Sequence, residues 1–171
     1  LFKSMSYKYS KGHQIIGDLS GSDDANRDTG IDFEENYIGF EAGGSAVMVV
    51  SGSNVGIGTT SPAASLHVDG SYAGKASVVS SWPHSVSSTD YIILATGTAS
   101  PVRKVTLPAI SGQQGRIIIV KDASGNAASN GLEVDGNSSE TIDGSADKLI
   151  NSNYGFLVLV CGASEWHIIG Q

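Results

Sequence analysis

Apolar residues in the first part of the chain come as short alternations with polar residues. The clearest runs lie between Ile31 and Val68, and Gly or Ser residues interrupt each of them. Alternation with a period of two predicts half-buried β-strands, because successive side chains of a strand point to opposite faces. The apolar positions that we expect to point inward are Ile31, Phe33, Ile38, Phe40, Ile57, Leu66 and Val68.

These strands are too short to build a core within one chain. Each offers too little apolar area to offset the conformational entropy that its residues lose on folding. They become stable when copies of the chain bury the same residues against each other. The first part of the sequence therefore predicts an intertwined oligomer.

The second part of the chain has denser apolar runs. Residues 91–94 and 116–121 are typical of buried strands, and residues 103–107 alternate before Pro108 ends that run. Further short runs follow, separated by turn-forming residues, at 132–134, 141–142, 148–150, 154–161 and 165–169. About eight strands at this spacing predict a compact antiparallel β-sandwich or barrel.

The composition supports an all-β fold and excludes several other classes. Gly supplies 22 of the 171 residues, while charged residues make up only 16% and aromatic residues 7%. A chain rich in Ser, Gly, Val, Ile and Thr with no Gly-X-Y period is not a coiled coil, a helical bundle or a collagen. Hydrophobic residues still amount to 40%, which argues against wholesale disorder.

The charge and the apolar runs also exclude some partners. The net charge of −7 with few arginines argues against binding to a nucleic-acid backbone. The longest apolar runs, 117–120 and 156–161, are too short to span a membrane, so we expect no membrane insertion. The single cysteine, Cys161, excludes an intrachain disulfide, and its apolar surroundings predict a buried, inert thiol.

Two segments carry a specific resemblance. The segment SNVGIGTTSPAASLHVDG, residues 53–70, resembles the VGIGTTSP…LHV-G segment of trimeric fibre proteins, notably bacteriophage tail fibres and tail spikes. The preceding NYIGFEAGG, residues 36–44, is similar to the strand pattern that often comes before that segment in such fibres. Residues 105–169 resemble, more loosely, the knob-like modules at the C-terminal ends of phage fibres.

The resemblance implies a homotrimeric virion appendage. Residues 1–75 would form an elongated stem-like β segment, residues 76–90 a linker rich in Ser, Ala and Gly, and residues 91–171 a compact β-rich tip. The inward apolar positions of the stem would then form the trimer core. The implied partners are other virion structural proteins and a glycan or protein receptor on the host surface. Because residue 1 is Leu and no signal-peptide pattern follows, we expect a fragment of a longer protein or a processed product.

One acidic segment has a spacing close to that of a calcium-binding loop. Carboxylate and amide oxygens fall at loop positions typical of an EF-hand, on Asp24, Asn26, Asp28, Asp32 and Glu35. However, the glycine comes one residue late and no helix flanks the loop. We therefore favour a solvated acidic strand or turn, with no cofactor, and keep a calcium site as the alternative.

Loop residues of the tip are the candidates for receptor contact. Asparagine amides bind sugar hydroxyls and an exposed aromatic ring stacks on the apolar face of a pyranose, so we select Asn126, Asn130, Asn153 and Tyr154. Trp166 alternates with Ile168 in an expected strand, which places both in the core.

We predict no enzymatic activity and no catalytic residues. The sequence has no Gly-x-Ser-x-Gly nucleophile motif, and its paired carboxylates are merely neighbours in expected strands. The predicted function is structural and adhesive, in a virion appendage. The alternatives are a bacterial surface adhesin or carbohydrate-binding module, and less favoured a polysaccharide depolymerase.

Overall fold

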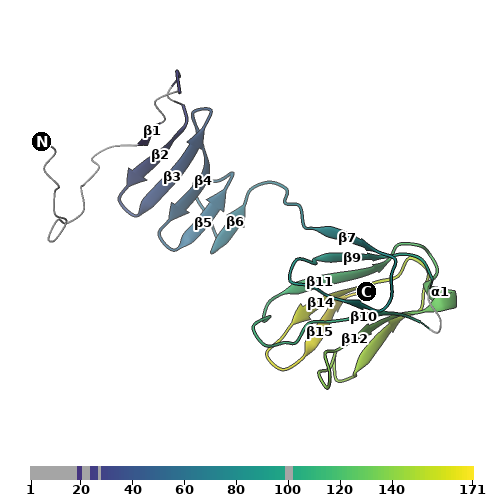
Figure 1. Ribbon diagram of the computed structural model, residues 1–171. Helices are drawn as coiled ribbons and strands as arrows, with labels where there is room; N and C mark the ends of the chain where they lie inside the picture. Colours follow the sequence, from purple (N-terminus) through teal and green to yellow (C-terminus); the bar gives the residue numbers. More distant parts are fainter. Residues whose placement is uncertain (1–18, 21–23, 27, 99–101) are drawn as a thin grey trace, which may run out of the picture. The chain divides into compact units, whose positions relative to one another are not determined.

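β-Strands are the main regular secondary structure of the described residues. The computed structural model describes residues 19–20, 24–26, 28–98 and 102–171. The chain divides into two compact units after Tyr72, here called unit 1 and unit 2 (Figure 1). The described residues contain β-strands and one four-residue helix, α1 (Ala127–Asn130), so the predicted all-β class is confirmed.

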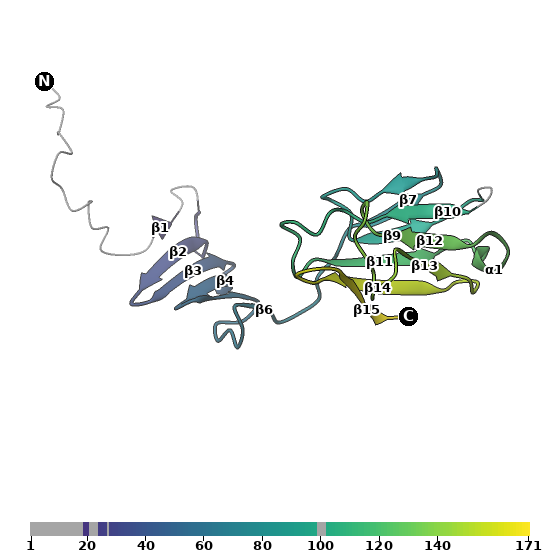
Figure 2. The same ribbon diagram turned by 90° about the horizontal axis from the view of Figure 1, so that it is seen from below.

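Unit 1 contains a single layer of strands (Figures 1 and 2). Its six-stranded sheet follows the order of the sequence, and neighbouring strands are antiparallel except for the parallel pair β5–β6. The strands are β1 (Leu19–Ser20), β2 (Gly30–Glu34), β3 (Tyr37–Ala42), β4 (Ser45–Ser51), β5 (Asn54–Ile57) and β6 (Leu66–Val68).

The strand register gathers apolar side chains on one face of this sheet. Ile38 lies opposite both Phe33 and Val50, and Phe40 lies opposite both Ile31 and Met48. Because directly opposed residues share a face, the register defines what we call the unit 1 apolar face. Its members are Leu19, Ile31, Phe33, Ile38, Phe40, Met48, Val50, Val55, Ile57, Leu66 and Val68.

All of the predicted inward positions lie on the unit 1 apolar face, and no second layer covers it among the described residues of unit 1. Leu66 remains 62% exposed, Phe33 46% and Ile57 43%, and the other members are at least partly exposed. Leu and Phe side chains each gain about 2 kcal/mol when they are fully buried. This face therefore leaves much of its hydrophobic stabilisation unused in a single chain.

The opposite face of unit 1 is acidic. Asp32, Glu34 and Glu41 surround Tyr37 there, and the pKa of Tyr37 is raised by partial burial and by these three carboxylates. The alternation Ile31, Asp32, Phe33 thus separates apolar and charged side chains onto the two faces, as the sequence predicts.

The glycines of the fibre-like motif allow the chain to fold back closely. A Cβ atom on Gly56 would lie 2.4 Å from the carbonyl oxygen of Thr59 and 3.0 Å from the side chain of Val49. Gly58 has a φ of +74°, which favours glycine. Val49, packed beside Gly56 on the acidic side of the sheet, is completely buried.

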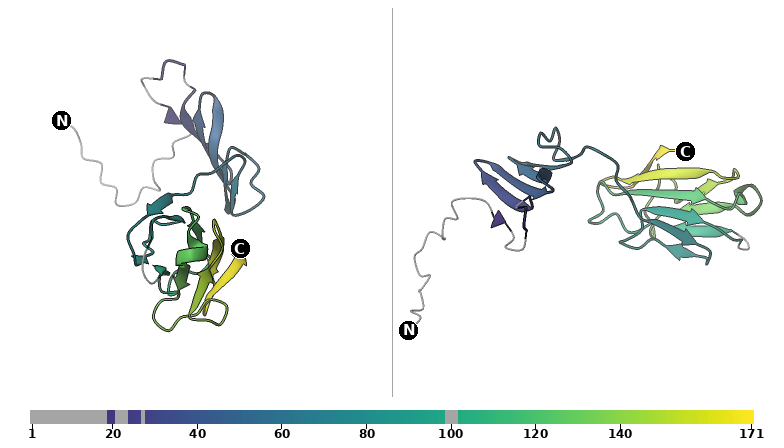
Figure 3. Two further views of the ribbon diagram at one scale, coloured as in Figure 1. Left: turned by 90° about the vertical axis from the view of Figure 1, so that its right-hand side faces the viewer. Right: turned by 90° about the horizontal axis from the view of Figure 1, so that it is seen from above.

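Unit 2 contains two sheets that enclose one core (Figure 3). The five-stranded sheet has the order β15-β14-β11-β9-β7, and the four-stranded sheet has the order β13-β12-β10-β8. The strands are β7 (Ala76–Val79), β8 (His84–Ser85), β9 (Ile92–Ala95), β10 (Arg103–Thr106), β11 (Ile117–Asp122), β12 (Leu132–Asp135), β13 (Asp147–Ile150), β14 (Phe156–Cys161) and β15 (Trp166–Gly170).

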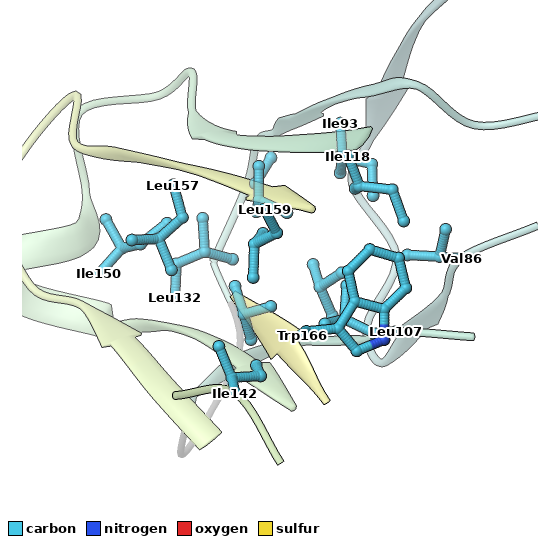
Figure 4. Packing of buried hydrophobic residues seen from close by; sticks show 14 of the residues in the cluster. Val86, Ile93, Leu107, Ile118, Leu132, Ile142, Ile150, Leu157, Leu159 and Trp166 are labelled. Atoms are coloured by element: carbon cyan, nitrogen blue, oxygen red, sulfur yellow. The ribbon is translucent and has the colours of Figure 1, made fainter. Parts of the chain in front are cut away.

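The core of unit 2 takes alternate residues from both sheets (Figure 4). Ile118 and Leu159 of the five-stranded sheet and Leu132 of the four-stranded sheet are completely buried. Trp166 is also completely buried, and its indole Nε1 donates to the Pro108 carbonyl oxygen at 3.3 Å. Its predicted place in the core is confirmed, as is the burial of Cys161.

The structure differs from the sequence prediction in two respects. The range 76–90, expected to be a linker, contains β7 and β8, and β7 pairs along its length with β9. The pairing in unit 2 is mixed, not antiparallel, because β7–β9, β9–β11, β8–β10 and β10–β12 are parallel. Short apolar runs indicate strands, but they do not indicate strand direction.

A buried carboxylate holds the segment that was expected to be a linker. Asp90 is 7% exposed and accepts hydrogen bonds from the Ser87 backbone and hydroxyl and from the Ser77 hydroxyl, at 2.8–2.9 Å. His84 Nε2 lies 3.3 Å from the same carboxylate. Burial alone raises the pKa of Asp90, but these hydrogen bonds lower it to about 2. Polar Ser and His residues therefore order this segment, although their composition is typical of a linker.

One ion pair lies inside the core. Arg103 and Asp122 are both 0% exposed, and Arg103 Nη1 donates to Asp122 Oδ1 at 2.9 Å. Arg103 Nε donates in addition to the Gly131 carbonyl oxygen at 3.1 Å. Breaking a buried pair by removing one partner is costly, because the remaining charge stays buried without compensation.

We expect Arg103→Met to destabilise unit 2 by about 3–5 kcal/mol. The matched control is Lys104→Met on the same strand, whose ion pairs with Glu133 and Asp135 are partly exposed and whose loss costs about 1 kcal/mol or less. Urea unfolding followed by tryptophan fluorescence measures both variants, since Trp82 and Trp166 both lie in unit 2. If both variants lost the same free energy of unfolding, the stabilising role of the buried Arg103–Asp122 pair would be contradicted.

Candidate functional site

The candidate site lies where strand β11 ends and strand β14 begins. Asp122 closes β11, and its Oδ2 accepts backbone hydrogen bonds from Ala127 and Tyr154, both at 3.0 Å. Its Oδ1 binds Arg103 and the Ser124 hydroxyl. Asp122 therefore ties two loops to the core, the one that leads into α1 and the one at 151–155.

The two loops also contact each other directly. Asn153 Oδ1 accepts a hydrogen bond from the backbone nitrogen of Ala128 at 2.9 Å. The ring of Tyr154 lies against Gly125, where a Cβ atom would be only 2.5 Å from the ring carbon Cζ. Gly125 is thus required by the close approach of the ring as well as by its φ of +70°.

Tyr154 is held in place while its ring stays accessible. Its backbone has a φ of +60°, which is uncommon for a non-glycine residue, and its carbonyl oxygen accepts a hydrogen bond from Lys121 Nζ. The Lys121 Nζ lies 5.7 Å from the centre of the Tyr154 ring, within the range of a cation–π contact. The side chain remains 62% exposed, so a fixed aromatic surface faces solvent.

A hollow of about 380 Å³ opens beside Tyr154. It is lined by residues 149–157 together with Gln171, which combine amide side chains with the partly exposed ring of Phe156. Aromatic rings and amides in one concave surface suit a ligand that has both apolar faces and hydroxyl groups, as a sugar does.

The structure brings together only part of the predicted receptor set. Asn153 and Tyr154 line the hollow. Asn126 precedes α1 and accepts a backbone hydrogen bond from Asn130 at 2.9 Å, so both belong to the neighbouring loop and neither lines the hollow.

Sequence reasoning missed Asn151, Ser152, Phe156 and Gln171, which also line the hollow. The Asn-Ser-Asn-Tyr run at 151–154 was an available signal. By contrast, the contribution of Gln171 depends on how β15 pairs with β14, which the sequence does not reveal.

The predicted calcium ligands of unit 1 lie before, within and just after strand β2. Asp24 Oδ2 accepts a hydrogen bond from the Thr29 backbone at 2.7 Å, and Asp32 lies in the middle of β2. Within the described ranges, no three His, Cys, Asp or Glu side chains are grouped so that they could hold a metal ion. The calcium alternative on Asp24, Asn26, Asp28, Asp32 and Glu35 stays a prediction.

No protein family matches this chain, and no curated protein sequence matches it. In the part of the chain that the structure describes, no helix is long and apolar enough to cross a membrane.

Acid should destabilise unit 2. Burial alone raises the pKa of Asp122, but hydrogen bonds from Arg103, Tyr154 and Ala127 lower it to about 2. The pKa of Asp90 is likewise lowered to about 2 by its hydrogen bonds. A lowered folded-state pKa stabilises the fold above about pH 4, and that stabilisation is lost as the pH falls toward 2. Each carboxyl contributes on the order of 2 kcal/mol.

The measurement is the free energy of unfolding of unit 2 between pH 5 and pH 2, followed by tryptophan fluorescence. Asp90→Asn should flatten the pH dependence, whereas Asp147→Asn, at an exposed position of β13, should leave it unchanged. A profile of Asp90→Asn that runs parallel to that of the unsubstituted chain would contradict this account.

Proposed function

We propose that this chain is part of a homotrimeric virion fibre whose unit 2 binds a receptor on the host surface. The observation that carries the proposal is the unit 1 apolar face, which forms one side of a single-layer sheet and has no second layer over it among the described residues of unit 1. Surfaces of this kind mark association sites in soluble proteins.

Copies of the chain are the best occupants of that face. The opposite face carries Asp32, Glu34 and Glu41, and the chain as a whole has a net charge of −7. Like-charged chains repel each other through their acidic faces, so association is favoured through the neutral apolar ones. Each large side chain that becomes buried then adds about 2 kcal/mol to the stability of the assembly.

The proposed number of three chains in the assembly is supported by sequence resemblance. Two copies could cover each other face to face, whereas three sheets enclose a central core. The segments at 36–44 and 53–70 resemble those of trimeric phage fibres, and the close approach at Gly56 and the turn at Gly58 account for the glycines of that motif.

The receptor-binding role is supported by the hollow beside Tyr154. Its exposed aromatic ring and the neighbouring amides suit a glycan, and Asp122 fixes the loops so that little ordering is needed on binding. Three such sites in one assembly would bind a glycan-coated surface far more tightly than one site alone.

Replacing the exposed ring tests the role of the hollow. On an array of immobilised bacterial surface glycans, the intact chain should bind a subset of glycans, and Tyr154→Ala should weaken that binding about tenfold or more, as expected for loss of a stacking ring. Tyr72→Ala is the control, because Tyr72 is a 73% exposed tyrosine of the other unit.

Two outcomes would count against the proposed function. Binding that Tyr154→Ala and Tyr72→Ala weaken equally would exclude the hollow as the binding site. Release of new reducing ends from the bound glycans would favour the depolymerase alternative over an adhesive role.

A further inference from the structure

The five-stranded sheet of unit 2 has a second face, directed away from the core. The register places Ile119 opposite Ile92 on one side and Val158 on the other, and Ile117 opposite Val160. On β7, Ala76 and Val78 lie opposite Ile92 and Leu94. We call this surface the unit 2 apolar face; its members are Ala76, Val78, Ile92, Leu94, Ile117, Ile119, Phe156, Val158 and Val160.

This face is apolar over four adjacent strands. Val78 is 70% exposed and Phe156 39%, and the other members are partly or fully exposed. The polar side chains that share the face are Lys121 and His167. Lys121 donates to the Tyr154 carbonyl oxygen, and His167 Nδ1 lies 3.2 Å from an Asp143 carboxylate oxygen.

The outer face of the four-stranded sheet is different. Lys104 lies opposite Glu133 and forms ion pairs with Glu133 and Asp135. These carboxylates raise the pKa of Lys104, which keeps it charged. Charged side chains therefore occupy the middle of the outer face of the four-stranded sheet, with Leu149 exposed on its edge strand, whereas the five-stranded sheet presents Ile, Leu and Val.

We propose that the unit 2 apolar face is a second self-association surface, covered by the same face of other copies of this chain. The inference rests on the proposed fibre function, and it goes further because it assigns an interface to unit 2, where the sequence predicted only a receptor-binding tip. Unit 2 would then be an assembled part of the fibre rather than a free monomeric head.

Charge favours copies of the chain as the occupant. The acidic and ion-paired surfaces of a chain with net charge −7 repel another such chain, and this face is one that lacks carboxylates among its members. A homomer also covers the apolar faces of both units with one kind of partner.

The area of the two faces supports the same occupant. Strands about 4.8 Å apart, with about 3.3 Å per residue, give the unit 1 apolar face roughly 430 Å² in plan and the unit 2 apolar face roughly 320 Å². A stable protein interface buries about 800 Å² per partner, so either face alone falls short. Together the two faces come much closer to that requirement, which indicates that association through unit 1 alone would be weak.

Cysteine labelling in the full chain tests the inference. Val78→Cys reports the unit 2 apolar face, and Leu149→Cys is the matched control, because Leu149 is 53% exposed on an edge strand of the four-stranded sheet. Leu66→Cys, at a position 62% exposed on β6, reports the unit 1 apolar face. Native Cys161 is buried, so the unsubstituted chain gives the background.

We expect a maleimide to label Val78→Cys at least tenfold more slowly than Leu149→Cys, while native mass spectrometry finds three chains per particle. Equal labelling of these two variants, with three chains per particle and Leu66→Cys protected, would overturn the inference and leave the proposed fibre function standing. Particles of one chain with all three cysteines labelled rapidly would overturn both.

Discussion

An apolar face of a β-sheet must be covered by another layer, and the structure of this protein depends on how that requirement is met. In unit 2, the two sheets cover each other's inner faces and bury Trp166, Leu159 and Leu132 between them. Among the described residues of each unit, no second layer covers the unit 1 apolar face or the unit 2 apolar face. In the proposed trimer, copies of the chain supply this cover, and the shared core explains how a Ser- and Gly-rich chain can be stable.

Charge and burial are arranged consistently with that requirement. Acidic residues occupy the face of unit 1 opposite the apolar one, and ion pairs occupy the outer face of the four-stranded sheet in unit 2. The buried pair of Arg103 and Asp122 has another task, since Asp122 fixes the loops that present Tyr154. Asp122 thus holds the loops beside the hollow, and Phe156 belongs both to the lining of the hollow and to the unit 2 apolar face.

Much of this could be predicted from the sequence, because period-two alternation determines which side chains share a face. Ile31, Phe33, Ile38 and Phe40 could be placed on one face in this way, as could Trp166 in the core. The direction of the strands and the order of the segment at 76–90 could not be predicted from the sequence. Both depend on contacts between residues that are apart in the sequence, such as the hydrogen bond from Ser77 to Asp90. The unit 2 apolar face was missed because a run such as 116–121 looks the same whether one face or both are buried.

The central claim is that copies of this chain cover each other's apolar faces, and sedimentation equilibrium of the unsubstituted chain at micromolar concentration tests it most directly. The account predicts a folded particle with three times the mass of the chain, and no change in that mass when the salt concentration rises, since the association is hydrophobic. A folded particle with the mass of a single chain would contradict it.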